Sequence, residues 1–193
     1  PDESVDLIFT DPVYDRIEDY RWLAETAARV LKPGGNLVMY QAHLYLPKTF
    51  VMLANISLSF RWLIFDHKIG VQSSVFGPRV LSRTRAAIVY FKLPITHEWL
   101  VDIVNSRPMG NSVNHEWSKN PSATIQWLSM FPGAVVFDPF TGGGTVPSCC
   151  VMLDRHFIAF EIDPATAERA RERVRNTQPP LSGLLVEQLE MEL

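Results

Sequence analysis

A glycine-rich turn is the first feature of the sequence that could bind a ligand. Gly142, Gly143 and Gly144 follow an apolar segment, 135–137, and precede a segment with helical spacing. Glycine lets the backbone approach a ligand where a Cβ atom would clash. About twenty residues later a second apolar segment leads to Glu161, where nucleotide-binding α/β proteins place an acid against ribose hydroxyls. The spacing predicts a ribose-containing ligand, and the alternative is a tight strand-to-helix connection without one.

A second polar motif, Asp11-Pro12-Val13-Tyr14, directly follows the apolar run Val5–Thr10. Open α/β sheets place their active sites at the carboxyl ends of strands, which is where this motif would lie. The alternative is a strand-ending turn in which Asp11 only caps the backbone.

Together the two motifs resemble the S-adenosylmethionine-dependent amino-methyltransferases of DNA. Asp11-Pro12-Val13-Tyr14 is similar to the D-P-P-Y signature of that family, with Val13 in place of the second proline. Phe140, Gly142 and Gly144 match its F-x-G-x-G turn, and the order of the motifs matches the β class. The resemblance covers the chain from Val5 to about Arg175. It implies methyl transfer to the exocyclic amino group of a flipped base in double-stranded DNA.

The resemblance assigns the catalytic roles to Asp11, Pro12 and Tyr14. The Asp11 carboxylate and the Pro12 backbone carbonyl accept hydrogen bonds from the amino group, and Tyr14 stacks on the base. Asp11 rather than Ser at the head of the motif favours adenine N6 over cytosine N4. Three alternatives stay open: an N4-cytosine enzyme, a non-catalytic cofactor-binding subunit, and a methyltransferase of RNA or of protein amides.

The resemblance also assigns residues to the cofactor, S-adenosylmethionine. The Phe140 ring lies against its methionine part, since a π face attracts the sulfonium cation. Lys119 and Asn120 open a helix whose N-terminus suits the cofactor's carboxylate, and the alternative is that they cap or flank that helix. We expect Asp163 to cap the helix that begins at Pro164. The predicted cofactor residues are Lys119, Asn120, Asp138, Phe140, Gly142, Gly144, Thr145 and Glu161.

Positive charge gathers in one part of the chain although the whole carries a net charge of -3. That net charge excludes a uniformly basic nucleic-acid coat but allows a local basic face. Residues 61–92 contain six Lys and Arg against a single acid, Asp66, and we expect this lobe to contact DNA phosphates. The alternative is a solvated basic face. The predicted DNA-binding residues are Lys68, Arg79, Arg83 and Arg85.

Length and composition limit the remaining possibilities. The chain has 193 residues, of which 47% are hydrophobic and 20% charged, the profile of one globular domain. We expect a catalytic domain over 1–178 and an acidic tail over 179–193. Cys149 and Cys150 are adjacent, so we predict packing roles, no metal site and a reducing compartment. We therefore expect a cytoplasmic, nucleoid-associated protein of a prokaryotic or phage-infected cell, without a membrane span, either homodimeric or aided by another subunit in recognising its target.

Alternating apolar runs and helical spacings predict the elements that carry these motifs. Strands are expected at Val5–Thr10, 36–40, 60–65, 86–91, 134–137 and 157–162, and helices at 18–32, 47–58, 123–131, 145–153 and 164–175. The resulting fold class is α/β: a circularly permuted Rossmann-like methyltransferase, with a mostly parallel twisted sheet covered by helices on both faces. The strands Val5–Thr10 and 134–137 should be neighbours. Strand 86–91 should run antiparallel near an edge.

Overall fold

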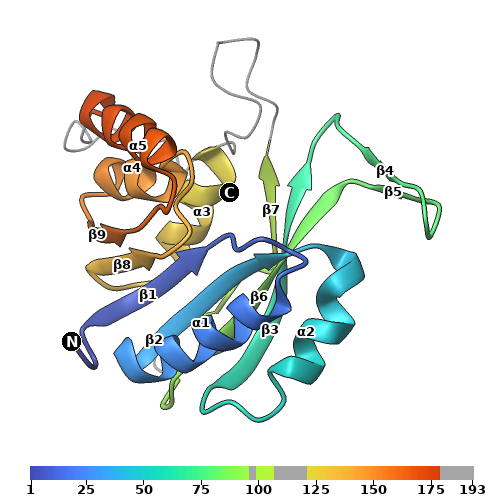
Figure 1. Cartoon of the computed structure of the whole chain (residues 1–193), viewed down its shortest axis with the longest axis horizontal. Helices are drawn as coiled ribbons and strands as arrows, with labels where there is room; N and C mark the ends of the chain where they lie inside the picture. The colour runs from blue at the N-terminus through green and yellow to red at the C-terminus, as the bar shows by residue number, and fades with distance from the viewer. Residues whose placement is uncertain (96–98, 107–120, 179–193) are drawn as a thin grey trace.

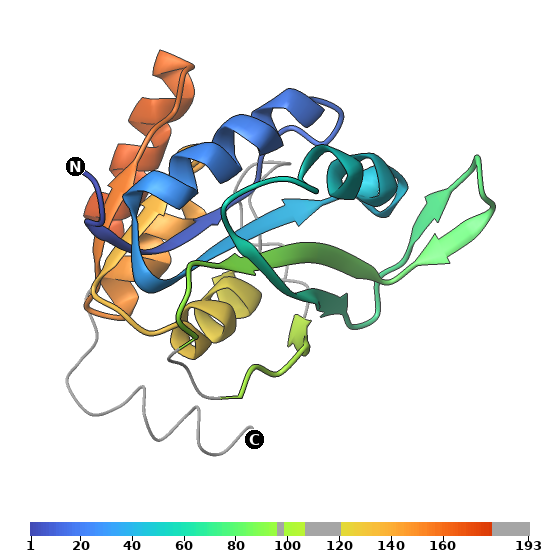
Figure 2. The same cartoon turned by 90° about the horizontal axis from the view of Figure 1, so that it is seen from below.

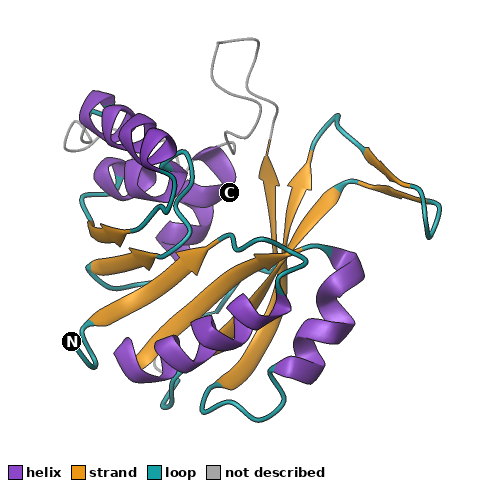
Figure 3. Ribbon diagram, in the orientation of Figure 1, coloured by secondary structure: helices purple, strands orange, loops and turns teal. Residues whose placement is uncertain are grey.

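A twisted seven-stranded sheet forms the centre of the computed structural model, which describes residues 1–95, 99–106 and 121–178. The strand order is β7-β3-β6-β2-β1-β8-β9 (Figures 1 and 3). β6 is antiparallel to both of its neighbours, whereas the other adjacent strands are parallel. The bounds are β1 Val5–Thr10, β2 Leu31–Gln41, β3 Ser59–Lys68, β6 Thr84–Phe91, β7 Ile103–Ser106, β8 Val135–Asp138 and β9 His156–Ala159.

β1 lies between β2 and β8, which confirms that the strands carrying the two motifs are neighbours. Leu7 pairs in parallel with Asn36 of β2 on one side and with Val136 of β8 on the other. Because both strands run in the same direction, their carboxyl ends meet at one edge of the sheet. Asp11 and the glycine-rich turn therefore follow the carboxyl ends of two neighbouring strands.

Helices cover both faces of the sheet (Figure 2). α1 and α2 lie on one face, α3 and α4 lie on the other, and α5 packs beside α4. The bounds are α1 Ile17–Val30, α2 Leu46–Met52, α3 Pro121–Met130, α4 Thr145–Met152 and α5 Pro164–Asn176, with a short 3-10 helix, η1, at His43–Tyr45. The arrangement confirms the predicted fold class.

Two cores explain why β1 is apolar over Leu7–Phe9. Leu7 and Phe9 of β1 point into the core under α3 and α4, while Ile8 points into the core under α1 and α2. A stretch of strand buried on both faces favours consecutive apolar residues, because alternate side chains point to opposite faces. Cys149 and Cys150 are free, fully buried members of the first core, as their predicted packing roles require.

Some predicted boundaries were wrong for local reasons. The first helix ends at Val30 rather than 32, because Leu31 already adopts an extended conformation and begins β2. Gly34, with a φ of +84°, lies where the β1–β2 register shifts, so the Lys-Pro-Gly-Gly segment bulges within the strand. The helix predicted at 47–58 is the shorter α2, and the strand predicted at 157–162 ends at Ala159.

Three strands were not predicted. β7 pairs in parallel with β3, which leaves the antiparallel strand β6 third from that edge of the sheet. β4 (Ser73–Val75) and β5 (Val80–Ser82) form a separate antiparallel hairpin between β3 and β6. Among the described residues, no helix is long and apolar enough to cross a bilayer.

Candidate active site

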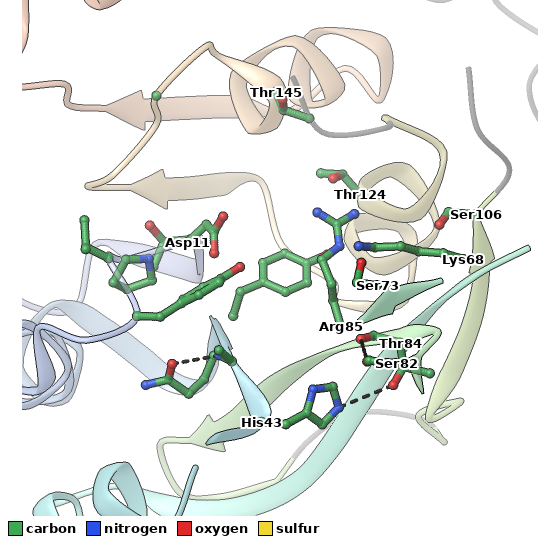
Figure 4. A pocket seen from close by; sticks show the side chains of 18 of the residues that line it. Asp11, His43, Lys68, Ser73, Ser82, Thr84, Arg85, Ser106, Thr124 and Thr145 are labelled. Atoms are coloured by element: carbon green, nitrogen blue, oxygen red, sulfur yellow. Dashed lines mark hydrogen bonds between the residues drawn. The ribbon is translucent and has the colours of Figure 1, made fainter. Parts of the chain in front are cut away.

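A cavity of about 1250 Å³ opens at the carboxyl ends of β1, β2 and β8 and extends to the β4–β5 hairpin. Figure 4 shows Asp11 on one side of this cavity and Lys68 and Arg85 on the opposite side. The volume exceeds what a single drug-sized ligand needs, so a cofactor and a base could both be accommodated. The predicted site residues that line it are Asp11, Pro12, Tyr14, Asp138, Phe140, Gly142, Thr145, Lys68, Arg83 and Arg85.

The Asp11 motif forms a turn between β1 and α1. The Arg16 backbone N–H donates to the Val13 carbonyl at 3.1 Å, and the Val13 side chain is 53% exposed at the cavity wall. Tyr14 is half-buried and packs against the core beneath α3 and α4. Burial raises the pKa of the Tyr14 phenol although Arg85 opposes the shift, so the ring stays neutral at physiological pH.

The glycine-rich turn is held by a dense set of backbone hydrogen bonds. The Phe140 N–H donates to Asp138 Oδ1 at 3.2 Å, and the Thr141 N–H donates to the Phe160 carbonyl at 3.0 Å. The Gly142 N–H donates to Glu161 Oε2 at 3.0 Å. These bonds join the turn after β8 to the segment after β9, so the two parts of the predicted cofactor site come together.

Gly142 and Gly144 both have positive φ values, but they meet different surroundings. A Cβ atom at Gly142 or Gly143 would meet nothing within 4 Å, so this part of the turn leaves open space beside the cavity. A Cβ atom at Gly144 would lie 3.0 Å from the Ala170 Cβ of α5. Gly144 therefore allows α5 to pack closely against the start of α4, a packing role that accounts for this glycine without a ligand.

Glu161 and Asp163 follow β9 and have separate roles. The Glu161 carboxylate accepts from Gly142 N–H and, at 2.9 Å, from Asp163 N–H. A carboxylate offers about four acceptor positions, so ribose hydroxyls can still bind it. The Asp163 side chain accepts from the Thr166 N–H at 2.7 Å, which confirms the predicted cap of α5.

A buried hydrogen bond connects the two motifs. The Thr10 hydroxyl donates to Asp138 Oδ1 at 2.6 Å, and both side chains are at most 3% exposed. The same oxygen accepts from Phe140 N–H, so one carboxylate ties the residue before Asp11 to the glycine-rich turn. Thr10 was not predicted, although a polar residue that ends an apolar strand was a usable signal.

Two further residues support the cofactor side of the cavity. The Trp22 ring of α1 meets the Phe140 ring edge to face, with 6.0 Å between the centroids. Arg173 of α5 donates through Nη1 to the Gly143 carbonyl at 3.2 Å and to the Thr145 hydroxyl at 3.0 Å. Sequence reasoning missed both, because neither residue stands in a motif and both contacts join distant segments.

On the opposite side, Arg85 is held by buried polar groups. Arg85 and Asp66 pair across β6 and β3, and their ion pair measures 2.5 Å with the Asp66 side chain fully buried. Ser106 donates to the other Asp66 oxygen, and the Arg85 guanidinium lies 5.5 Å from the Tyr40 ring centroid. Arg85 is thus a fixed cation of the cavity wall rather than a solvated side chain.

The other predicted cations occupy different environments. Lys68 lines the cavity, and burial together with the neighbouring Arg85 lowers its pKa, with Asp66 acting in the opposite direction. Arg83 is exposed at the cavity rim, whereas Arg79 lies outside the cavity at the end of the β4–β5 hairpin. Lys119 and Asn120 fall outside the described residues.

The part of the chain that the structure describes offers neither a metal site nor an activated cysteine. There, no group of three or more His, Cys, Asp or Glu side chains could hold a metal ion. Burial raises the pKa of the Cys149 and Cys150 thiols to about 12, so neither is a thiolate at neutral pH. Neither thiol is therefore activated as a nucleophile.

Comparison with known proteins relates the sequence to DNA methyltransferases. No family model matches the chain. The Type II methyltransferase M.BamHI of Bacillus amyloliquefaciens is 27% identical over an alignment 234 positions long, gaps included, which covers 91% of this chain and 54% of M.BamHI. The chain therefore spans about half the length of that relative.

Two solved structures share the fold. The complex of M1.HpyAVI with SAM gives a TM-score of 0.72 at 22% identity, over 89% of each chain. The cytosine-N4-specific PvuII DNA methyltransferase gives a TM-score of 0.76 at 14% identity, over 100% of this chain and 85% of its own. At these identities the likeness shows a methyltransferase fold.

Proposed function

We propose that this protein transfers a methyl group from S-adenosylmethionine to the exocyclic amino group of a base in double-stranded DNA, with adenine N6 as the acceptor. The supporting observation is that the Asp11 motif and the glycine-rich turn line one cavity from adjacent parallel strands. The similarity to M.BamHI, named a Type II methyltransferase, agrees with this activity.

The residues after β8 and β9 fit the cofactor. Gly142 and Gly143 leave open space beside the cavity, and Glu161, which accepts from Gly142 N–H but is not itself part of the cavity lining, would accept hydrogen bonds from ribose hydroxyls. Phe140, held by Trp22, offers an aromatic surface to a cationic sulfonium. Thr145 completes this wall at the start of α4, while Lys119, Asn120 and Gly144 remain sequence-based candidates. When bound, S-adenosylmethionine would supply an electrophilic methyl group: its S–CH3 bond breaks as the N–CH3 bond forms, it leaves as a neutral thioether, and the acceptor nitrogen releases one proton to solvent.

Asp11, Pro12 and Tyr14 would hold the base. The lone pair of an aromatic amino group is delocalised into the ring, which makes the nitrogen a weak nucleophile. Two acceptors, the Asp11 carboxylate and the Pro12 carbonyl, would hold the two N–H groups and aim the lone pair at the methyl carbon. Tyr14, neutral and half-buried at the wall, would stack on the flipped base.

The opposite wall would receive the DNA. Lys68 and Arg83 line the cavity, and Arg79 lies at the end of the adjacent hairpin. Their charge suits phosphate contacts, and Arg85, paired with Asp66 on the cavity wall, would contact the DNA from inside the cavity. We assign catalysis to residues 1–178 and DNA contact to the lobe at 61–92, with a second copy or another subunit completing target recognition.

The test is expression in a bacterium without its own DNA methyltransferases, followed by nucleoside mass spectrometry of the genomic DNA. N6-methyladenine is expected, and Asp11→Ala should remove it while Asp15→Ala, a neighbouring exposed carboxylate, should not. N4-methylcytosine alone would correct the acceptor base. Labelled methyl transfer to RNA or protein but not DNA, or cofactor binding without any transfer, would contradict the proposal.

A further inference from the structure

An aromatic side chain stands almost fully exposed at the end of the β4–β5 hairpin. β4 and β5 pair from Ser73↔Ser82 to Val75↔Val80, and residues 76–79 form the hairpin tip. Figures 1 and 2 show this hairpin projecting away from the sheet and its helices. Phe76 is 87% exposed. Val80 and Leu81 of the same hairpin are also exposed, by 49% and 60%, so the hairpin presents several apolar side chains rather than one, a feature that favours contact with a partner.

The hairpin tip has a defined shape. The Arg79 N–H donates to the Phe76 carbonyl at 3.3 Å, and Arg79 adopts a left-handed φ of +55°. Pro78 restricts the turn further because its ring fixes its own φ. The tip is therefore a structured turn that presents Phe76 and a cation together.

The hairpin also borders the proposed active site. Its cross-strand pairs Ser73–Ser82 and Val75–Val80 all line the cavity whose other side carries Asp11 and Tyr14. At its base, the Lys68 N–H donates to the Arg83 carbonyl at 2.8 Å, so these two basic residues meet where the hairpin leaves the sheet. Duplex DNA that delivers a base into the cavity from this side would lie against the hairpin.

Base flipping leaves a gap in the duplex and costs stacking and pairing energy. Proteins that distort DNA often insert an apolar side chain between base steps and bind the neighbouring phosphates with Lys or Arg. An exposed Phe beside an Arg on a projecting hairpin, with further cations at its base, combines these two properties.

We propose that Phe76 inserts into the DNA duplex at the position that the flipped target base vacates, with Arg79 on an adjacent phosphate. This inference rests on the proposed function. It assigns to the hairpin tip the stabilisation of the flipped state, a task separate from holding the base in the cavity.

The first experiment measures single-turnover methylation by the full chain of a short duplex that carries the sequence modified in the expression host. Phe76→Ala should slow methylation of the paired target about tenfold or more, given what base–aromatic stacking contributes. The loss should shrink to within about twofold when the target base faces a mismatch, because less energy is then needed to flip it.

The second experiment needs no target sequence. Fluorescence anisotropy compares binding to an intact duplex and to the same duplex with a single abasic site. The wild-type chain should prefer the abasic duplex several-fold, and Phe76→Ala should lose that preference. Phe76→Leu, which keeps an apolar side chain, should retain most of it. Val51→Ala, which truncates a 79% exposed residue of α2, is the matched control and should change nothing.

The outcomes separate the two proposals. The insertion is overturned if Phe76→Ala methylates paired DNA as fast as wild type. It is also overturned if the variant's methylation rate falls by the same factor on paired and mismatched targets. Either result leaves the proposed function standing. A wild-type chain that transfers no methyl group to DNA overturns the proposed function, and the insertion with it. Thermal unfolding of Phe76→Ala should match wild type, because the side chain is exposed.

Discussion

The glycine-rich turn and the β4–β5 hairpin border the same cavity but are built in opposite ways. In the turn, the backbone N–H groups of Phe140, Thr141, Gly142 and Gly144 all find acceptors within the protein. The hairpin pairs mainly with itself, and most of its residues are exposed. The turn is fixed before any ligand arrives, as a small ligand of constant shape requires. The hairpin leaves its surface exposed, which would suit the large and deformable polymer that we propose as its partner.

The largest expected effect comes from removing the carboxylate between these two regions. Under the proposed function Asp11 would act on the amino group as the transition state forms, so Asp11→Ala should raise the activation barrier by about 2 kcal/mol or more and slow turnover roughly 30-fold. Cofactor affinity should stay close to wild type. Steady-state kinetics and calorimetric titration of S-adenosylmethionine measure the two quantities, and Asp15→Ala is the control.

Glu161→Ala, beside the glycine-rich turn, should have the opposite pattern: weaker cofactor binding with little change in turnover. We expect cofactor binding to weaken by about 1–3 kcal/mol, because under the proposed function Glu161 would hold the ribose in ground and transition states alike. Turnover at saturating cofactor should change little, and Glu172→Ala on α5 serves as the control. If Asp11→Ala abolished cofactor binding while Glu161→Ala left it unchanged, the two ends of the site would be assigned the wrong way round.

Thr10→Val tests the bond that links the Asp11 motif to the turn. Loss of the 2.6 Å hydrogen bond to Asp138 should lower the free energy of unfolding by about 1–2 kcal/mol. Turnover should fall more than cofactor affinity, because the variant loosens the spacing between the two motifs. Urea unfolding measures the stability and steady-state kinetics measure the turnover. Thr10→Ser keeps the hydroxyl and should retain most of the wild-type value of both. A variant with normal stability and normal turnover would remove any role for this bond.

The smallest effect should come from single cations of the hairpin. Arg79→Ala should reduce the slope of log binding constant against log salt by about one and leave thermal stability unchanged, because one phosphate contact is lost. Arg21→Ala on α1 is the control for a charge change elsewhere. An unchanged slope would place Arg79 away from the DNA.

The sequence predicted the region with fixed geometry better than the region open to a partner. The motifs and the cap at Asp163 follow from local patterns of strand, turn and helix, and the adjacency of β1 and β8 followed from the family resemblance that those motifs carry. The three-residue strands β4 and β5 show too short an alternation to be recognised. The Thr10–Asp138 bond and the Arg173 contacts join residues far apart in the chain. Arg85 looked like a free cation because its partner, Asp66, is revealed only by the β3–β6 register.

The central position of β1 also constrains how the protein is made. Its contact with β2 is relatively local, since Phe9 pairs with Val38, whereas Leu7 must wait for Val136 to be synthesised. Pairings of such high contact order form late, because closing a long loop costs entropy before the contact repays it. On the ribosome, β1, β2, β3 and β6 can assemble while the far side of β1 is still bare. The nascent protein therefore forms the Asp11 turn and the β4–β5 hairpin before the glycine-rich turn. The complete cavity is a late product of translation.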